Sequence, residues 1–158
     1  MNERELEAVH CVMHRLEQRW NVLPIPNGEV WHPYDPLPPA MFLALLAQAA
    51  DLTEGRRFLD LGSGIGRNLA LAYHLGWEVA GVEQHEPYFD ACREMLPEAT
   101  LTLADICDLD DFDADVVYMY RPAVEEAHEE AVEAHVTGRL APGTVLLLPV
   151  RPDPVRVI

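Results

Sequence analysis

Three glycines at alternate positions make FLDLGSGIGRN the segment of this sequence with the clearest chemical potential. Gly62, Gly64 and Gly66 follow an apolar run, Arg57–Leu61, and precede a helical stretch, Arg67–Leu75. Glycine has no Cβ, so such a loop can turn sharply and let a ligand approach the backbone. The helix that follows directs unpaired N–H groups toward the same place. The pattern predicts a ligand-binding loop between a strand and a helix, and a plain tight turn is the alternative.

Three carboxylates are expected at the same edge of the sheet as this loop. Asp60 lies inside the first apolar run, Glu83 ends the second and Asp105 follows the third. Glu83 is placed to accept hydrogen bonds from both hydroxyls of a ribose, and a solvated strand end is the alternative. Asp105 is placed to accept one from an adenine amino group, with Ile106 packing beside the base. Asp60 is costly to bury without a partner, so it meets a ligand ammonium group or caps the loop amides.

Two common nucleotide-binding motifs do not fit the glycine loop. A dinucleotide fingerprint, G-x-G-x-x-G, needs a third glycine where this sequence has Arg67. A P-loop needs a Gly-Lys-Ser/Thr ending, and the chain contains no lysine. The first mismatch disfavours an NAD(P)-dependent oxidoreductase, which is kept as an alternative.

Apolar runs alternate with helical patterns along most of the chain. Such alternation is typical of right-handed βαβ units and of a parallel sheet covered on both faces. We therefore predict an α/β fold with a Rossmann-like, doubly wound sheet. The expected strands cover 57–61, 77–83, 100–104, 115–120 and 144–150, and the expected helices cover 3–20, 38–50, 67–75, 87–96 and 124–140.

Residues 1–37 are expected to form an extension of the domain that covers residues 38–158. Apolar residues of the first helix recur at spacings of three and four, so their stripe packs on the parent domain or makes a dimer contact. Prolines then break every periodicity and produce an irregular lid segment. Trp31 and Tyr34 in this segment could flank a cationic group by cation–π attraction, or simply hold the loop in place.

The charge balance limits the partners of the protein. The 158-residue chain has 27 acidic and 11 basic side chains, which gives a formal net charge of −16. Nucleic-acid affinity comes mainly from Lys and Arg side chains that neutralise phosphates, so DNA, RNA and anionic membranes are disfavoured as partners. A surface this negative attracts cationic ligands and basic proteins instead.

The cysteines and histidines predict neither a disulfide framework nor a metal site. Cys11, Cys92 and Cys107 are scattered and include no CxxC pair, which suits a reducing cytoplasm. Two histidine pairs at helical spacing lack the further ligands of a zinc-protease motif. The charged first residues lack the apolar core of a signal peptide, and the longest apolar stretch is too short to span a membrane. A cytoplasmic protein without a metal is expected.

Five segments in a fixed order resemble the motif series of the class I S-adenosylmethionine-dependent methyltransferases: FLDLGSGIGRN, GVEQ, LADI, ADVVYMY and LAPGTVLLL. The likeness covers residues 38–150, and its specificity lies in the order and spacing of the pieces. It implies a sheet ordered 3-2-1-4-5, S-adenosylmethionine as cofactor and S-adenosylhomocysteine as product. Members usually continue into a sixth and a seventh strand. Here the sheet is expected to end at five strands or to gain one short strand from Val155–Ile158.

The resemblance also implies which residues meet the cofactor and the acceptor. The methionine half of the cofactor lies against the glycine loop and Asp60, while the acids of the next two strands hold the ribose and the adenine. Residues that end the fourth strand face the transferred methyl group, and Tyr118 and Tyr120 are the predicted catalytic residues; core packing is the alternative for both. The predicted cofactor-binding set is Tyr34, Asp60, Gly62, Ser63, Gly64, Gly66, Asn68, Glu83, Gln84, Asp105 and Ile106.

The sequence thus predicts methyl transfer from S-adenosylmethionine to an amine-type acceptor, either a protein lysine or a small cationic amine. The compact size, the Pro-rich approach to the second helix and the segment ADVVYMYRP are similar to the small archaeal and mitochondrial protein-lysine methyltransferases. The alternatives are an NAD(P)-dependent oxidoreductase and a non-catalytic S-adenosylmethionine-binding subunit. A homodimer is one assembly that the sequence allows.

Overall fold

The computed structural model describes residues 2–20, 37–121 and 126–158, which include one six-stranded sheet of order β3-β2-β1-β4-β5-β6. The first five strands run parallel to their neighbours. The predicted α/β class and the order 3-2-1-4-5 are confirmed. The strands are β1 (Arg57–Leu61), β2 (Glu78–Glu83), β3 (Thr100–Leu103), β4 (Val116–Met119), β5 (Val145–Leu147) and β6 (Val155–Val157).

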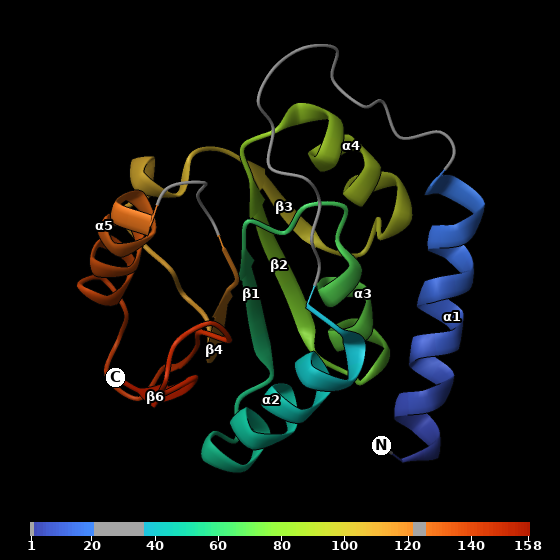
Figure 1. Cartoon of the computed structure of the whole chain (residues 1–158), viewed down its shortest axis with the longest axis horizontal. Coiled ribbons are helices and arrows are strands. Elements are labelled where there is room, and N and C mark those ends of the chain that lie inside the picture. Colours follow the sequence, from blue (N-terminus) through green and yellow to red (C-terminus); the bar gives the residue numbers. More distant parts are fainter. Residues whose placement is uncertain (1, 21–36, 122–125) are drawn as a thin grey trace.

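Helices cover both faces of this sheet (Figure 1). One face carries α2, α3 and α4, and the other carries α5 together with residues 105–114. No helix among the described residues is long and apolar enough to cross a lipid bilayer. The helices are α1 (Glu3–Trp20), α2 (Pro39–Leu52), α3 (Arg67–His74), α4 (Glu86–Met95) and α5 (Glu126–Thr137), with a short 3-10 turn, η1 (Ile106–Asp108).

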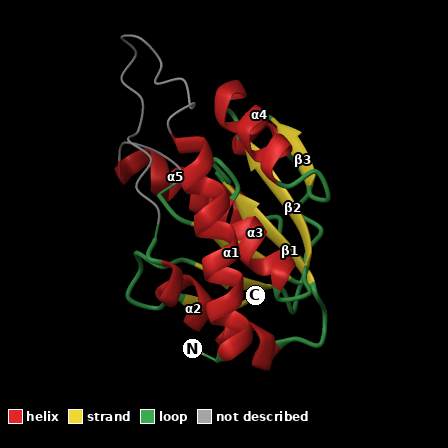
Figure 2. Ribbon diagram, turned by 90° about the vertical axis from the view of Figure 1, so that its right-hand side faces the viewer, coloured by secondary structure: helices red, strands yellow, loops and turns green. Residues whose placement is uncertain are grey.

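The first helix packs on its own domain, which is one of the two arrangements that its apolar stripe allows. Ala8, Val12 and Leu16 are buried and belong to the same hydrophobic cluster as the apolar residues of α3. Figure 2 shows α1 running past α3 on the outside of the molecule. Of the predicted stripe, Leu16 is buried, Val9 and Met13 are partly buried against the cluster, and Leu6 is exposed. The face that packs on the domain is therefore shifted toward Ala8 and Val12, and the homodimer stays a prediction.

The last strand departs from a wholly parallel sheet. β6 pairs with β5 in the antiparallel direction, with Val145 opposite Val157 and Leu147 opposite Val155. The chain reverses within a short loop, closed by a 2.8 Å hydrogen bond from Leu148 N–H to the Pro154 carbonyl, and so short a return can only give an antiparallel neighbour. Of the two expectations for this edge, the one short extra strand is correct.

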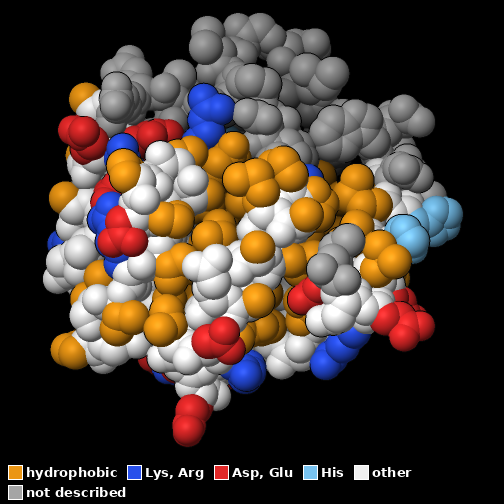
Figure 3. Space-filling view, turned by 60° about the horizontal axis from the view of Figure 1, so that its bottom comes forward, with side chains coloured by type: hydrophobic (Ala, Val, Ile, Leu, Met, Phe, Trp, Pro, Cys, Tyr) orange, Lys and Arg blue, Asp and Glu red, His pale blue; other side chains and the backbone are white. Residues whose placement is uncertain are grey.

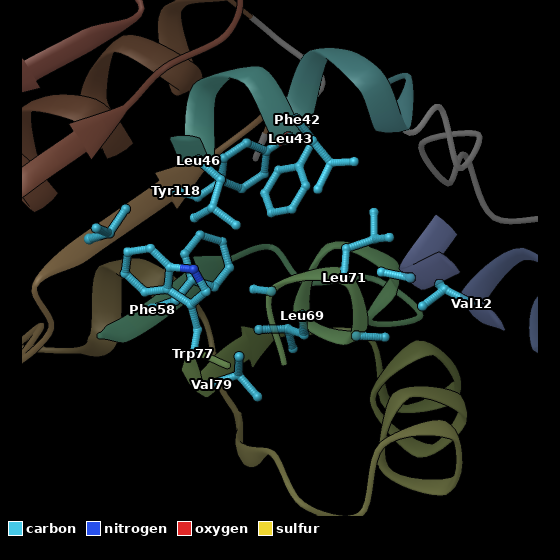
Figure 4. Packing of buried hydrophobic residues seen from close by; sticks show 14 of the residues in the cluster. Val12, Phe42, Leu43, Leu46, Phe58, Leu69, Leu71, Trp77, Val79 and Tyr118 are labelled. Atoms are coloured by element: carbon cyan, nitrogen blue, oxygen red, sulfur yellow. The ribbon is translucent and has the colours of Figure 1, made fainter. Parts of the chain in front are cut away.

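The larger core cluster lies between the sheet and the helices α1 to α4. Its centre is a group of aromatic rings from α2, β1 and β4, which Figure 4 shows turned toward one another. The ring centroids of Phe42 and Tyr118 are 5.4 Å apart at 88°, and those of Phe42 and Phe58 are 5.7 Å apart at 76°. Such edge-to-face contacts fix ring orientation as well as burying apolar area. Tyr118 is therefore held in one direction by its neighbours.

The amino-terminal ends of the parallel strands form a face rich in hydrophobic side chains (Figure 3). Met41 and Leu52 of α2 and Val157 of β6 are exposed, and α2 lies beside β6. The glycine loop follows β1 and lies at the opposite edge of the sheet. The two edges therefore differ in chemical character.

Candidate functional site

The glycine loop leaves β1 in a conformation that favours glycine. Gly62, Gly64 and Gly66 have φ angles of 85°, 54° and 80°. The N–H groups of Gly62 and Ser63 both donate to the Val82 carbonyl, at 2.9 and 3.0 Å, which ties the loop to the neighbouring strand. A side chain at any of the three glycines would be strained. The predicted sharp turn is therefore present at the carboxyl end of β1.

Packing beneath the loop also requires glycine. A Cβ built on Gly66 would collide with the Cys92 thiol of α4. A Cβ on Gly81 of β2 would lie 2.7 Å from Leu69 Cδ1 and 3.0 Å from Ser63 Cβ. The loop thus sits directly against β2 and α4. Two glycines provide this fit: Gly66 of the loop and Gly81, the first residue of the segment GVEQ.

Glu83 joins the loop to the end of β2. Its side chain is buried, with 6 % of the residue exposed. One carboxylate oxygen accepts from Gly64 N–H and the other from His85 N–H, each at 2.8 Å. Each carboxylate oxygen has two lone-pair sites. Glu83 can therefore hold the loop in place and still accept hydrogen bonds from two ligand hydroxyls.

Asp60 is the most deeply buried carboxylate of the described chain, with 2 % exposure. Burial and, to a smaller extent, the nearby Glu83 carboxylate raise its pKa to about 8, while Arg67 opposes both effects. Burial of an unpaired ionised carboxylate is costly. Asp60 is therefore largely protonated at neutral pH in the free protein, and a cationic group brought beside it would favour the ionised form.

Several polar atoms around Asp60 are buried without a hydrogen-bond partner among the described residues. The Tyr118 hydroxyl, Asn68 Oδ1, Arg67 Nε and Ser63 Oγ are in this position. Buried polar atoms in folded proteins are nearly always satisfied, because each unsatisfied one costs about 1–3 kcal/mol. We refer to Asp60, Ser63, Arg67, Asn68 and Tyr118 as the buried polar cluster. These atoms are what a polar ligand would satisfy.

Arg67 is the member of this cluster whose role was not predicted, because in the sequence it stands out only as a replacement of the third fingerprint glycine. It is the first residue of α3, it is buried, and its guanidinium donates to the carbonyl of Leu37, just before α2. It also lowers the pKa of Asp60. An aspartate inside an apolar strand, followed after the glycine loop by an arginine that starts a helix, is the signal that could have identified this interaction.

The predicted adenine-side residues lie at the end of β3. Asp105 is exposed and caps η1 by accepting from Cys107 N–H at 2.8 Å, and Ile106 is buried in the second core cluster. The Ala104 N–H donates to the Glu83 carbonyl at 3.1 Å, so this segment is joined to the end of β2. Gln84 is exposed beside it. The structure therefore brings these residues to the same edge as the loop, and their contacts with adenine stay predictions.

The two predicted catalytic tyrosines differ in their surroundings. Tyr118 is 1 % exposed and packs in the aromatic core, so the alternative of core packing applies to its ring. Its pKa is raised well above the usual range by burial and by Asp60. Tyr120 is half-buried just beyond β4. Trp31 and Tyr34 lie outside the described residues.

The described residues include no group of three or more His, Cys, Asp or Glu side chains arranged to hold a metal ion. One histidine of α5, His135, has its Nε2 atom 2.8 Å from the Leu109 carbonyl and packs against the Phe112 ring. His135 therefore fixes the 105–114 segment to α5. All three cysteines are free.

No protein-family model matches the sequence, and no curated protein matches it. Solved structures do. The CcbJ methyltransferase from Streptomyces caelestis is 27 % identical over 75 % of this chain and 52 % of its own, with a TM-score of 0.59. The glycopeptide N-methyltransferase MtfA, solved with S-adenosylmethionine, is 25 % identical over 68 % of this chain and 48 % of its own, with a TM-score of 0.55. This chain thus spans about half the length of either protein.

A third structure matches nearly the whole chain. The putative RNA methyltransferase PH1948 from Pyrococcus horikoshii aligns with 97 % of this chain and 76 % of its own, with a TM-score of 0.67 and 21 % identity. At that identity the likeness shows the fold. Together with the strand order and the glycine loop between β1 and α3, these matches show that the chain has the fold of the class I S-adenosylmethionine-dependent methyltransferases, which its motif series resembles.

Proposed function

We propose that this chain transfers a methyl group from S-adenosylmethionine to an amine-type acceptor, either a protein lysine or a small cationic amine. The observation that carries the cofactor assignment is Glu83, whose carboxylate joins the glycine loop to β2 and keeps lone pairs for two hydroxyls. The buried atoms without partners nearby fit a ligand that carries its own polar groups. MtfA, which has this fold, was solved with the same cofactor.

The proposed cofactor contacts follow the strand ends. Glu83 accepts from the ribose, the backbone of Gly62–Gly66 lies along the methionine part, and Asp105 with Ile106 borders the adenine. S-adenosylmethionine supplies a methyl group that is already activated on a sulfonium. The protein therefore has to hold and align the two reactants, and good alignment is worth about 7–11 kcal/mol of the barrier.

The amine acceptor is supported by charge. The net charge of −16 favours a cationic acceptor and disfavours RNA, the acceptor class named for PH1948. The name of MtfA states N-methylation, which is transfer to a nitrogen. An amine must lose its proton before it can attack, and the reference pKa of a lysine is about 10.4. Tyr120, half-buried beyond β4, is the proposed residue that orients the amine through its hydroxyl.

The two alternatives make different binding predictions. An oxidoreductase binds NADH, whereas a non-catalytic subunit binds S-adenosylmethionine and transfers nothing. Calorimetric titration with S-adenosylmethionine, S-adenosylhomocysteine and NADH separates the first from our proposal. We expect both adenosyl compounds to bind and NADH not to bind. Binding of NADH alone would overturn the cofactor assignment.

Labelled-methyl transfer tests the acceptor and the enzyme assignment together. The chain is incubated with methyl-labelled S-adenosylmethionine and either a lysate or a panel of small amines, and the labelled species is identified by mass spectrometry. We expect the label on a nitrogen of a basic protein or a small amine, and a strong loss of transfer in Tyr120→Phe. Cofactor binding without transfer at high protein concentration would favour the subunit.

Three free cysteines suit a reducing compartment, and we propose a cytoplasmic location.

A further inference from the structure

The outer face of helix α2 lacks the charged side chains that a surface helix normally carries. Residues 36–50 contain no charged side chain, although 24 % of the whole chain is charged. The exposed residues of α2 before its last turn are alanine, methionine and glutamine. Its inner face is apolar as well, with Phe42, Leu43 and Leu46 buried. A helix that is apolar on all sides is normally buried, so the outer face of α2 has the composition of a covered surface.

This apolar surface continues from α2 onto the sheet edge at β6. Val155 packs against the core cluster that contains the inner residues of α2, and α2 lies beside β6. Val157 projects to the same face as Val155, because alternate residues of a strand share a face, and it is 56 % exposed. An exposed apolar surface of this kind is typical of an interaction site. We define the α2 face as Ala40, Met41, Ala44, Ala47, Leu52 and Val157.

The charges at the two ends of α2 complement those of a second, antiparallel α2 helix. The N-terminus of α2 has no side-chain cap and no acid in its first turn, while the last turn contains Asp51 and no basic residue. The partial positive charge at a helix N-terminus attracts acids, and the partial negative charge at the C-terminus repels them. An antiparallel partner helix would place each Asp51 beside the other helix's N-terminus. The α2 face is therefore electrostatically complementary to a copy of itself.

The residue spacing along α2 allows this antiparallel arrangement. Ala40, Ala44, Ala47 and Asp51 recur at intervals of four, three and four residues, so they lie along one side of the helix. This pattern is symmetric about the point midway between Ala44 and Ala47. A two-fold axis there pairs Ala44 with the partner's Ala47, and Ala40 with the partner's Asp51. Alanines at the crossing allow two helix axes to approach to about 8 Å.

We propose that the α2 face is the interface of a two-fold symmetric dimer of this chain, in which the two α2 helices pack antiparallel. A basic partner would find no acid on this helix before Asp51, and the net charge of −16 disfavours an anionic membrane surface. Two chains of the same negative charge can meet favourably only where like charges do not face one another. The inference does not depend on the proposed cofactor, because the glycine loop lies at the opposite edge of the sheet.

Sedimentation equilibrium of the whole chain, from about 1 to about 100 μM, tests the dimer and its interface. We expect a reversible dimer in the wild type. Ala44→Glu should raise the dimer dissociation constant about 100-fold, because the symmetry brings two unpaired carboxylates into the interface. Ala134→Glu, at an exposed position of α5, is the matched control with the same charge change and should leave the dissociation constant unaltered.

A charge exchange tests the antiparallel direction. Asp51→Arg and Ala40→Asp should each weaken the dimer about tenfold, since each places like charges together at the ends of the paired helices. The double variant should regain the wild-type dissociation constant, because each introduced arginine then meets the partner's introduced aspartate. Both single changes improve the charge at the ends of their own helix, so the monomers should stay folded, which circular dichroism checks.

The contrary outcomes are distinct. A wild-type chain that stays monomeric, or forms open assemblies larger than a dimer, would overturn the inference. An unchanged dissociation constant in Ala44→Glu would place the dimer interface elsewhere, and failure of the double variant to recover would contradict the antiparallel arrangement. Binding of neutral lipid vesicles or of a different protein by a monomeric wild type, lost in Ala44→Glu, would assign the α2 face to another occupant. None of these results bears on cofactor binding, which is measured separately.

Discussion

The charged side chains near the two ends of strand β1 lie in contrasting environments. At the amino end, Arg57 bonds Asp113 at 2.7 Å and Asp115 at 2.9 Å, and its backbone N–H donates to Asp115 as well. Arg57 and Asp113 are solvent-exposed, Asp115 is half-buried, and their bonds are satisfied within the protein. Near the carboxyl end, Asp60 is buried among atoms that have no partner among the described residues.

This difference separates a structural region from a binding region. Exposed ion pairs contribute little to stability, and replacing them disturbs only their surroundings. A buried and incompletely satisfied polar cluster lowers the stability of the free protein. A ligand that forms the missing hydrogen bonds can restore it. The carboxyl end of β1 should therefore be sensitive in binding experiments, and the amino end should not.

The largest effect is expected beneath the glycine loop. Gly66→Ala should lower the free energy of unfolding by about 2–4 kcal/mol, because alanine is strained at a φ of 80° and its Cβ would collide with Cys92. Gly143→Ala is the matched control, since its φ is 92° and nothing lies within 4 Å of the added Cβ. Chemical denaturation measures both, and equal losses in the two variants would mean that the contact with Cys92 is unimportant.

Glu83→Ala should weaken S-adenosylhomocysteine binding by about 1–3 kcal/mol, through the loss of charged hydrogen bonds to the ribose and of the support for Gly64. Glu78→Ala, an exposed position at the start of the same strand, should leave the affinity unchanged. Isothermal calorimetry gives both values. An unaltered affinity in Glu83→Ala would remove the ribose assignment.

Asp60→Asn should change how stability depends on pH. The folded chain holds a proton on Asp60 up to a pKa of about 8, whereas an exposed aspartate has 3.8. Between these values the folded state binds more protons than the unfolded state, so the free energy of unfolding of the ligand-free wild type falls as pH rises from about 4 to about 8.

Asparagine has no such proton, so the variant should lack this component, which is up to about 1.4 kcal/mol per pH unit. Thermal melts of both proteins from pH 5 to 8.5 measure it. Parallel pH profiles of the two proteins would show that Asp60 ionises normally.

The smallest effect is expected at the opposite end of β1. Arg57→Ala should produce a minor change in melting temperature and none in S-adenosylhomocysteine affinity, because the Arg57 side chain is exposed and its ion pairs are distant from the glycine loop along the strand. A clear loss of affinity in this variant would contradict the division between the two ends.

The fold was predictable because its signals are local. Each expected strand and helix of the domain is present, β1 has the predicted bounds, and the glycine spacing identified the loop. The antiparallel direction of β6 was not foreseen, because it depends on the short return loop between Leu148 and Pro154 and not on periodicity. The turn η1 was also missed, since it is only three residues long.

The site was predictable only where its residues belong to a motif. Glu83 and Gly64 were named from the sequence, but their mutual hydrogen bond joins residues 19 positions apart. The burial of Arg67, its bond to the Leu37 carbonyl and the close approach of Cys92 to Gly66 arise from packing of α2, α3 and α4 around β1. Such contacts depend on three-dimensional proximity, and residue type alone carries no sign of them.

The most direct test of the account is a crystal structure of the chain with S-adenosylhomocysteine. We expect the amino-acid part of the ligand along Gly62–Gly66 and beside Asp60, the ribose hydroxyls within hydrogen-bonding distance of Glu83, and the adenine beside Asp105 and Ile106. Density for the ligand elsewhere, or side chains of the protein occupying the space beside Glu83, would contradict it.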